Sequence, residues 1–291
     1  MLTDEKIKKY NQILLEKLSL YINLTPRFIT PEIVSELVNE CGLTATEAVS
    51  TLLAAALGLD IDGSSDDREL FFEYFPEMIS RLDTEVYESD PYYVGIPKFE
   101  AKFGEWEFRR ESYAPYELFV WNDLRKLRDG RVIPQIGFFE KEFDFPAVLE
   151  GGREWMTVTP NEIETMREAI ESAHGRVLTF GLGLGYFAYM AARCDEVESV
   201  TVVERDREVI ELFRKMILPH FPTPEKIRIV EGDAFEFADR LIDGEFDLIF
   251  TDIWHDPSDG VELYLKMKSY EQRAPHSRWL YWIEPTLKCY M

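Results

Sequence analysis

The chain has 291 residues, of which 46% are hydrophobic and 14% aromatic, so a disordered protein is excluded and there is room for two domains. Its 55 acidic and 32 basic residues give a formal net charge of −23. This charge argues against DNA or RNA as a substrate, because phosphate binding needs clustered lysine and arginine. It would suit a cationic small molecule, or it serves solubility alone.

The sequence gives no sign of a membrane segment or a signal peptide. No apolar run approaches the ~18 residues that span a bilayer. Residues 1–12 lack the charged and then apolar layout of a signal peptide. Cys41, Cys194 and Cys289 have no metal-ligand spacing and are interpreted as reduced thiols that fill the core. A cytoplasmic protein without a membrane partner or a metal site is therefore predicted.

Residues 1–88 are expected to form a helical domain. Apolar side chains recur at helical spacing between Ile7 and Tyr21, and this first element closes before Pro26. Further helices are predicted over residues 31–41, ended by Gly42; over 48–57, opened by a capping box at Thr44–Glu47; and over 69–82, interrupted at Pro76.

The second and third of these helices have the spacing of a helix-turn-helix. Residues 31–59 contain no lysine or arginine, however, and include several glutamates. Since a DNA-binding helix needs basic side chains, the sequence argues against a nucleic-acid partner. It favours a lid over a substrate or a dimerisation element.

A small β-rich connecting element is predicted between residues 89 and 158. Residues 103–108 alternate apolar and polar side chains, as a half-buried strand does. Residues 118–121 and 132–139 are two further candidate strands, and Asp129-Gly130 forms a turn before the last of them. An antiparallel β element is therefore expected ahead of the third predicted domain, which covers residues 159–291.

The third domain begins with a nucleotide-binding pattern. Residues 177–180 form a short apolar run, which is typical of a strand buried on both faces. A turn with Gly181, Gly183 and Gly185 follows, then a helix-forming stretch, then an apolar strand that ends on Glu204. Such glycines let the backbone approach a ligand, and the carboxylate can accept both hydroxyl protons of a ribose.

Two more strand ends repeat this pattern. Residues 227–230 are followed by Asp233 and Ala234, and residues 246–251 are followed by Asp252. In open α/β sheets, ligands bind outside the carboxyl ends of the strands. The fold class predicted for residues 159–291 is therefore α/β, a Rossmann-like, doubly wound and mostly parallel sheet.

Residues 159–285 resemble the class I S-adenosylmethionine-dependent methyltransferases and are most similar to the spermidine-synthase-like branch. The resemblance implies S-adenosylmethionine as cofactor, with its methionine part at the glycine turn and its ribose on the acid that ends the second strand. It implies that the acid and small residue after the third strand flank the adenine. The cofactor-binding residues expected on this basis are Gly181, Gly183, Gly185, Glu204, Arg205, Asp233, Ala234, Asp252 and Trp254.

The loop after the fourth strand is the richest stretch for catalysis, and the resemblance places it at the transferred group. Transfer from a sulfonium needs little acid–base help, so the protein mainly aligns the nucleophile and excludes water. An amine or hydroxyl nucleophile benefits from a base. The candidate catalytic residues are Asp252, His255 and Asp256, with His255 the first choice as base unless it is a surface histidine. Trp254 is suited to stacking or to cation–π attraction.

Four functions remain open from the sequence. The main hypothesis is a methyltransferase acting on a small molecule. The second is a spermidine-synthase-like aminopropyltransferase that uses decarboxylated S-adenosylmethionine, although Leu184 replaces an acid of that family and the spacing from Asp252 to Asp256 is one residue longer. A nicotinamide dehydrogenase fits Gly183-x-Gly185-x-x-Ala188 but does not explain Asp233. A non-catalytic cofactor-binding protein is the fourth.

Two further expectations concern the borders of this domain. Thr159–Glu162 is predicted to be a capping box that opens a helix, and residues 155–158 before it either line the methionine end of the pocket or pack in the core. A complete methyltransferase sheet has two more strands than this sequence provides. The unpaired edge predicts cover by the upstream β segment or by a partner subunit, which favours a homo-oligomer such as a dimer.

Overall fold

The computed structural model describes residues 2–24, 28–97 and 100–291, and the chain divides into two compact units. The first unit comprises Met1–Val86 and Ser112–Asp144, and the second comprises Tyr87–Glu111 and Phe145–Met291. The β-rich stretch expected over residues 89–158 is thus shared between the two units.

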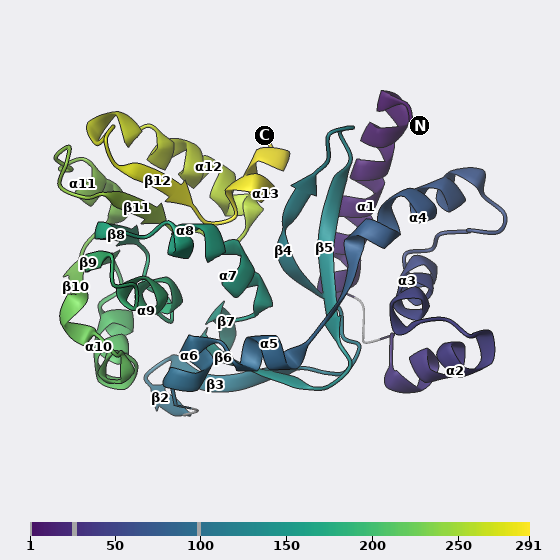
Figure 1. Ribbon diagram of the computed structural model, residues 1–291, viewed down its shortest axis with the longest axis horizontal. Coiled ribbons are helices and arrows are strands. Elements are labelled where there is room, and N and C mark those ends of the chain that lie inside the picture. Colours follow the sequence, from purple (N-terminus) through teal and green to yellow (C-terminus); the bar gives the residue numbers. More distant parts are fainter. Residues whose placement is uncertain (1, 25–27, 98–99) are drawn as a thin grey trace. The chain divides into compact units, whose positions relative to one another are not determined.

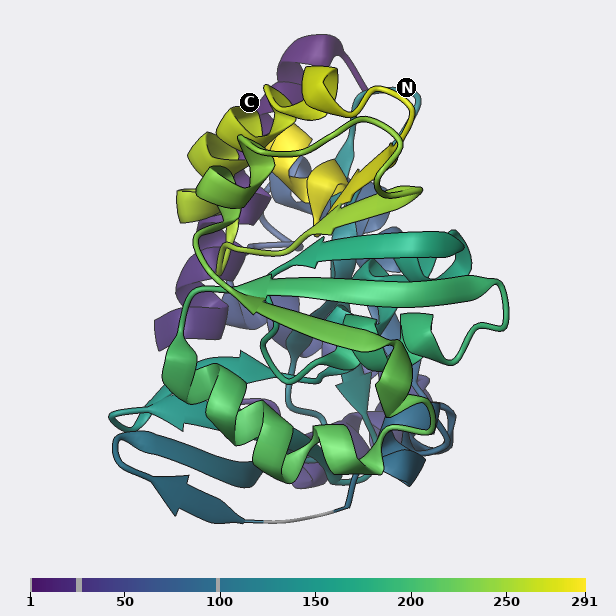
Figure 2. The same ribbon diagram turned by 90° about the vertical axis from the view of Figure 1, so that its left-hand side faces the viewer.

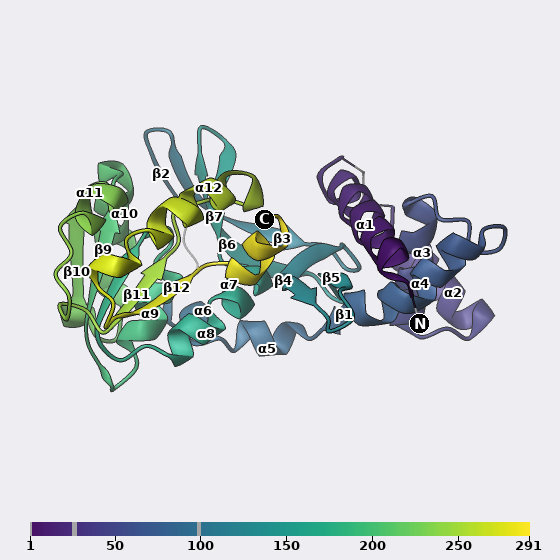
Figure 3. The same cartoon turned by 90° about the horizontal axis from the view of Figure 1, so that it is seen from above.

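The first unit combines four helices with a three-stranded sheet. Its elements are α1 (Asp4–Leu24), α2 (Pro31–Cys41), α3 (Ala45–Ala56), α4 (Ser65–Met78), β1 (Ile79–Leu82), β4 (Phe119–Lys126) and β5 (Val132–Phe139). Figure 3 shows the four helices grouped together. The central strand β5 is buried along its whole length, because β1 pairs with it in parallel on one side and β4 pairs antiparallel on the other.

The predicted helix signals of this unit are largely confirmed. Gly42 ends α2 with a φ of 70°. At the start of α3, the Glu47 backbone N–H donates to Thr44 Oγ1 at 3.2 Å, and the Thr44 N–H donates to Glu47 Oε2 at 2.8 Å, so the capping box is present. The predicted stop at Pro26 lies outside the described residues.

The predicted helix over residues 69–82 is wrong at its end. Helix α4 contains Pro76 and stops at Met78, and the next four residues form strand β1. This strand exists because it pairs with β5, where Ile79 is aligned with Ile136. A partner more than fifty residues away leaves no local signal, and the apolar spacing alone suggested a longer helix.

The cysteines do not fill the core as expected. Cys41 is exposed at the end of α2, and Cys194 and Cys289 are only partly buried. None of the described helices is long and apolar enough to cross a bilayer.

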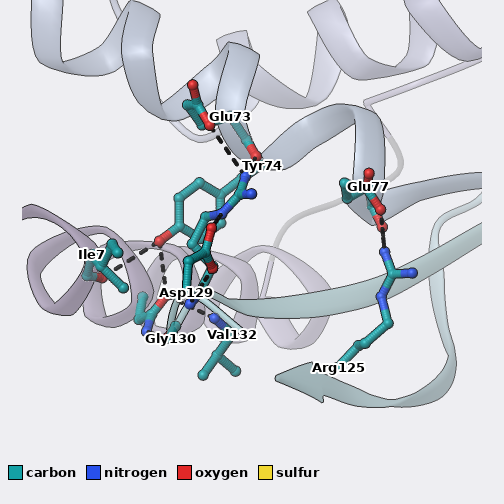
Figure 4. A network of polar contacts seen from close by, with 10 residues as sticks. Ile7, Glu73, Tyr74, Glu77, Arg125, Asp129, Gly130 and Val132 are labelled. Atoms are coloured by element: carbon teal, nitrogen blue, oxygen red, sulfur yellow. Dashed lines mark hydrogen bonds and ion pairs between the residues drawn. The ribbon is translucent and has the colours of Figure 1, made fainter. Parts of the chain in front are cut away.

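A polar network anchored by Asn11 ties α1 to the sheet of the first unit, and Figure 4 labels its partners Tyr74, Gly130 and Val132. Asn11 Oδ1 accepts hydrogen bonds from the Tyr74 hydroxyl and from the Val132 backbone N–H, both at 2.9 Å. Its Nδ2 donates to the Gly130 carbonyl at 3.1 Å. One side chain therefore satisfies polar groups from a helix and from a strand end.

We expect Asn11→Ala to lower the free energy of unfolding by about 2–4 kcal/mol, because it leaves the partly buried Val132 N–H without its acceptor and the Tyr74 hydroxyl with only the Ile7 carbonyl at 3.4 Å. Urea denaturation of the variant and the parent measures this loss. The neighbouring Gln12→Ala is the control, since Gln12 is exposed and its side chain donates to Glu16 in the same helix. It should change stability by less than about 0.5 kcal/mol. Equal effects of both changes would refute the role given to Asn11.

A four-stranded antiparallel sheet precedes the main sheet of the second unit. Its strands, in the order β2-β3-β6-β7, are β2 (Ala101–Phe103), β3 (Trp106–Tyr113), β6 (Phe143–Glu150) and β7 (Arg153–Thr157). The single strand predicted over residues 103–108 is wrong. Gly104, with a φ of 60°, turns the chain between β2 and β3, so the apparent alternation spans a hairpin.

The main sheet of the second unit has five parallel strands in the order β10-β9-β8-β11-β12. They are β8 (Gly175–Phe180), β9 (Val197–Glu204), β10 (Ile227–Glu231), β11 (Leu248–Thr251) and β12 (Arg278–Tyr281). Figure 2 shows them fanned side by side. The chain builds outward from β8 in one direction and then, from β11, in the other, which is the order of a Rossmann-like fold. The predicted fold class is therefore confirmed.

Helices connect these strands and precede the sheet. They are α5 (Thr84–Glu88), α6 (Pro91–Gly95), α7 (Pro160–Thr165), α8 (Arg167–Glu171), α9 (Tyr186–Ala192), α10 (Arg207–Met216), α11 (Ala234–Ala238), α12 (Pro257–Lys268) and α13 (Glu284–Cys289), with short 3₁₀ turns at Leu218–His220, Pro224–Lys226 and Glu271–Arg273. The predicted helix after the glycine turn coincides with α9.

Helices cover both faces of this sheet. Phe187 of α9 packs on Phe250 of β11 at 4.3 Å, and Tyr264 of α12 packs on Tyr281 of β12 at 5.0 Å between ring centroids. Thr251 is aligned with Tyr281 across the two strands. Since successive residues of a strand point to opposite faces, Phe250 and Tyr281 face opposite ways. Helices α9 and α12 therefore lie on opposite sides of the sheet (Figure 1).

Candidate functional site

A cavity of about 330 Å³ lies at the carboxyl ends of β8, β9, β10 and β11. Its volume falls at the lower end of the ~300–1,000 Å³ that is usual for ligand pockets. The predicted site residues that line it are Gly181, Gly183, Glu204, Arg205, Asp233, Ala234, Asp252, Trp254 and His255. Four strands thus deliver their carboxyl-terminal residues to one place, as expected at the switch point of an open α/β sheet.

At the glycine turn, atoms of Asp252 and Met156 lie very close to the backbone of Gly181 and Gly183. A Cβ on Gly181 would lie 1.9 Å from the Asp252 carbonyl oxygen. A Cβ on Gly183, which has a φ of 48°, would lie 1.6 Å from Met156 Sδ. Side chains are excluded at both positions, so bare backbone faces the cavity.

Gly185 has a different role from the other two glycines. It is absent from the cavity lining and is the residue before α9. A Cβ there would lie 2.3 Å from the Phe213 ring of α10. The third glycine therefore serves helix packing, and its predicted contact with a cofactor stays a prediction.

Glu204 is held at the tip of β9 by two backbone groups. Its Oε2 accepts from the Leu182 N–H at 3.1 Å, and its Oε1 accepts from the Asp206 N–H at 2.9 Å. A carboxylate has about four acceptor positions, so each oxygen can accept one more hydrogen bond. Glu204 is thus oriented across the glycine turn and keeps the capacity to bind two hydroxyls.

Asp233 is the N-cap of α11. Its Oδ1 accepts from the Phe235 N–H at 2.8 Å and from the Glu236 N–H at 3.1 Å. The cap fixes the side chain beside Ala234 and the Phe235 ring in the cavity lining. An acid, a small residue and an aromatic ring therefore form the wall next to the end of β10.

Acidic side chains dominate the other wall of the cavity. Burial, together with the negative charge of Glu204, raises the pKa of Asp252 from its ordinary 3.8 to about 7. Burial and the negative charges of Asp252 and Glu154 raise the pKa of Glu162 well above its usual range. Glu162 Oε2 is buried and has no hydrogen-bond partner among the described residues. A bound cation would lower the cost of ionising these acids.

Glu162 also overturns a prediction. In the expected capping box at the start of α7, Thr159 would have capped the helix, but its side chain makes no capping hydrogen bond. Glu162 instead lines the cavity. The sequence pattern is the same for a cap and for this placement, and only the tertiary position of α7 beside the sheet distinguishes the two.

The candidate base and the second acid are separated by the structure. His255 lines the cavity with its ring edge-to-face against Trp155 at 5.0 Å, and its side chain is 54% exposed, so it lies at the surface end of the cavity lining as one of the two expectations had it. Asp256 is absent from that lining and is the N-cap of α12, where its Oδ1 accepts from the Ser258 N–H at 2.6 Å. Its predicted catalytic role stays a prediction, while Asp252 and His255 share the cavity.

Several lining residues were missing from the predicted site. Trp155, Met156 and Thr157 line the cavity, in line with one of the two expectations for that segment. Residues not anticipated there are Glu154, Glu162, Leu182, Val203, Gly232, Phe235, Leu263 and Trp282. Leu263 comes from α12, and Trp282 comes from the segment after β12. The tertiary fold brings both segments to the cavity, and no local sequence signal indicates this.

The cavity residues fit a nucleoside-bearing sulfonium cofactor. Glu204 suits ribose hydroxyls, bare backbone at Gly181 and Gly183 admits a ligand, and Asp252 and Glu162 favour a nearby positive charge. Among the described residues, no group of three or more histidine, cysteine or acidic side chains has an arrangement that would hold a metal ion.

The strand order, the glycine turn and the acid at the end of β9 define the class of the second unit, a Rossmann-like nucleotide-binding fold. More particularly, residues 163–273 match the family model of the spermine/spermidine synthase domain. The predicted resemblance to the spermidine-synthase-like branch is therefore confirmed over this segment. No curated protein matches the chain in a sequence comparison.

Three solved structures illustrate the likeness. One is a spermidine synthase from Thermotoga maritima, with 19% identity over 46% of this chain and 48% of the other and a TM-score of 0.33. The second is a spermidine synthase in complex with the transition-state analogue AdoDATO, with 22% identity, 46% and 50% coverage and a TM-score of 0.35. The third is a putative O-methyltransferase from Klebsiella pneumoniae, with 23% identity, 38% and 47% coverage and a TM-score of 0.27. The chain spans about half the length of these proteins.

Proposed function

We propose that this protein is an S-adenosylmethionine-dependent methyltransferase whose acceptor is a small molecule with a basic nitrogen. The observation that carries the proposal is that Glu204, Asp233 and Asp252 line one cavity together with the bare glycine turn. Each of these residues ends or follows a strand of the parallel sheet. A second cavity, of about 30 Å³, is lined by none of these residues.

The chain's own residues would divide the work of binding. Glu204 would accept the two ribose hydroxyls, and Asp233 with Ala234 would flank the adenine. The backbone of Gly181 and Gly183 would pass beside the methionine part. When bound, the cofactor supplies a methyl group on a sulfonium, which needs alignment and a dry site more than acid–base chemistry.

The acidic wall supports a cationic acceptor. Asp252 and Glu162 are partly buried acids with raised pKa values, and Glu154 lies in the same lining. An acceptor ammonium would lower the pKa of these groups and be held by them. A neutral or anionic acceptor would give these carboxyl groups no reason to ionise and would leave them protonated.

Two placements favour methyl transfer over aminopropyl transfer. Leu184, at the position of an acid in the aminopropyltransferase pattern, is buried, and its carbonyl accepts from the Tyr92 hydroxyl at 2.7 Å. Asp256, which resembles the second acid of that pattern, caps α12 outside the cavity lining. Two carboxylates of that pattern are thus missing from this cavity.

Aminopropyl transfer from decarboxylated S-adenosylmethionine is the second candidate. It is favoured by the match of residues 163–273 to the spermine/spermidine synthase domain. The acidic wall is compatible with it as well, because the decarboxylated donor is a cation.

Calorimetric titration with S-adenosylmethionine, its decarboxylated form, S-adenosylhomocysteine and NAD tests the proposal. We expect S-adenosylmethionine and S-adenosylhomocysteine to bind, and Glu204→Ala to weaken binding by at least about 100-fold, because two hydrogen bonds to a charged acceptor are lost. Asp233→Ala should weaken it by about 10-fold or more. Glu236→Ala, an exposed change on the helix that Asp233 caps, is the matched control and should bind normally.

Each alternative has its own result in that titration. A clear preference for the decarboxylated donor would replace methyl transfer by aminopropyl transfer. NAD as the sole ligand would overturn the family of cofactors. Mass spectrometry after incubation with amines would detect any methylated product. Binding of S-adenosylmethionine without such a product would indicate a non-catalytic cofactor-binding protein.

A further inference from the structure

The side chain of His255 is fixed on two sides in the loop between β11 and α12. Asp259 Oδ2 lies 3.1 Å from His255 Nδ1, and both carboxylate oxygens of Asp259 also accept from the His255 backbone N–H, at 3.1 and 3.3 Å. Trp155 of β7 meets the imidazole edge-to-face, with the ring planes at 87°. The imidazole and its backbone are thus tied to the same carboxylate.

This contact determines the tautomer of the ring. An ionised carboxylate only accepts hydrogen bonds, so His255 Nδ1 must carry the proton in the contact with Asp259. In the neutral imidazole, Nε2 then keeps its lone pair and can accept a proton. The hydrogen bonds from His255 and Asp256 help to lower the pKa of Asp259, which favours its ionised form.

We propose that Asp259 is a positioning residue that holds His255 as the Nδ1–H tautomer, so that Nε2 takes a proton from the acceptor amine. This assignment rests on the proposed transfer to a basic nitrogen. His255 lines the same cavity as Asp252, whereas Asp259 does not and acts only through the ring. The residue is therefore assigned a role that neither the motif nor the comparisons give it.

The cap of α12 does not by itself require the contact with the ring. Asp259 is the third residue of the helix, and its Oδ1 accepts from the Asp256 N–H at 3.1 Å, which completes a capping box. One oxygen suffices for that purpose. The Oδ2 contact to Nδ1 is additional, and it links the start of the helix to a side chain of the cavity.

The proposed step balances in atoms and charge. A neutral amine nitrogen attacks the methyl carbon of the sulfonium, the C–N bond forms, and the S–C bond breaks to leave a neutral thioether. The proton that the acceptor ammonium must lose to become this amine passes to His255 Nε2. The imidazolium that results shares its Nδ1 proton with the Asp259 carboxylate.

Nitrogen NMR of the full chain, labelled at its four histidines, tests the assignment without any ligand. His255→Gln identifies the signals of that ring. We expect wild-type His255 to show the pattern of the Nδ1–H tautomer, and Asp259→Asn to shift it toward the other tautomer, because an amide can donate to Nδ1. Asn keeps an oxygen that can cap α12, so thermal unfolding should be nearly unchanged.

Kinetics with an amine acceptor supply the second readout. Asp259→Asn should lower kcat by about 100-fold or more, as expected for a misaligned base, with KM nearly unchanged. In a His255→Gln background, the same change should alter kcat by less than about 2-fold, since its effect passes through the ring.

The two readouts separate the possible failures. An unchanged tautomer in Asp259→Asn, or an equal loss of kcat with and without His255, would reduce Asp259 to a helix cap and overturn the assignment. Absence of transfer to any amine would defeat the proposed function. The tautomer measured in the free protein would still decide whether Asp259 orients His255.

Discussion

Replacement of Asp252 by asparagine is expected to stabilise the fold at alkaline pH while it abolishes transfer. The folded-state pKa of Asp252 is about 7, against an ordinary 3.8. Between these values the folded protein holds a proton that the unfolded chain has lost, so stability falls as the pH rises through this window. Below the lower value there is no such loss, and above the upper one the loss is complete.

The size of the effect follows from the same difference. From about pH 5 to about pH 8, wild-type protein should lose roughly 2–3 kcal/mol that Asp252→Asn retains, at about 1.4 kcal/mol per pH unit. Removal of the Asp252 charge should also lower the pKa of Glu162, because Asp252 contributes to raising it. Transfer should fall by about 100-fold or more, since an acid beside the reacting group is lost.

Urea denaturation at the two pH values measures the stability gap, with Asp239→Asn as control. Asp239 is exposed and pairs with Arg273, so its removal should give no gain at alkaline pH. A gap that stays constant with pH would show that Asp252 ionises normally in the folded protein. Such a result would also remove the main support for a cation at this wall.

The parts of the site that the sequence predicted are those with local signals. Glu204 and Asp233 each follow a short apolar strand, and the glycine turn lies between a buried strand and α9. Burial on both faces makes β8 and most of β9 continuous apolar runs. The rule that parallel strands deliver their ends to one edge then brought these residues together without knowledge of any contact.

The parts that it missed depend on contacts between distant segments. Strand β1 exists through its pairing with β5, and the first unit includes β4 and β5 because residues such as Asn11 bind across more than one hundred positions. Glu162 has the sequence pattern of a cap and becomes a cavity acid only where α7 meets the sheet. Asp256 shows the converse, since its motif suggested catalysis and its carboxylate caps a helix.

Gly183→Ala is expected to damage both the fold and ligand binding. The residue has a φ of 48°, and its Cβ would lie 1.6 Å from Met156 Sδ, which accepts a hydrogen bond from the Leu184 N–H at 3.1 Å. The left-handed conformation costs an alanine roughly 1–2 kcal/mol, and displacement of Met156 adds to this. We expect a total loss of about 2–4 kcal/mol in the free energy of unfolding.

Gly232→Ala is the matched control, because a Cβ there has no heavy atom within 4 Å although the residue lines the same cavity. Its stability should stay within about 0.5 kcal/mol of the parent. Combining Gly183→Ala with Met156→Ala removes the steric clash but not the backbone strain, so stability should recover only in part. Full recovery would show that the left-handed backbone conformation of residue 183 does not reduce the free energy of unfolding. If Gly183→Ala itself loses no stability, the glycine turn has room for a side chain. The proposed binding mode depends on a close approach of this backbone to a cofactor, and it would then have to be abandoned.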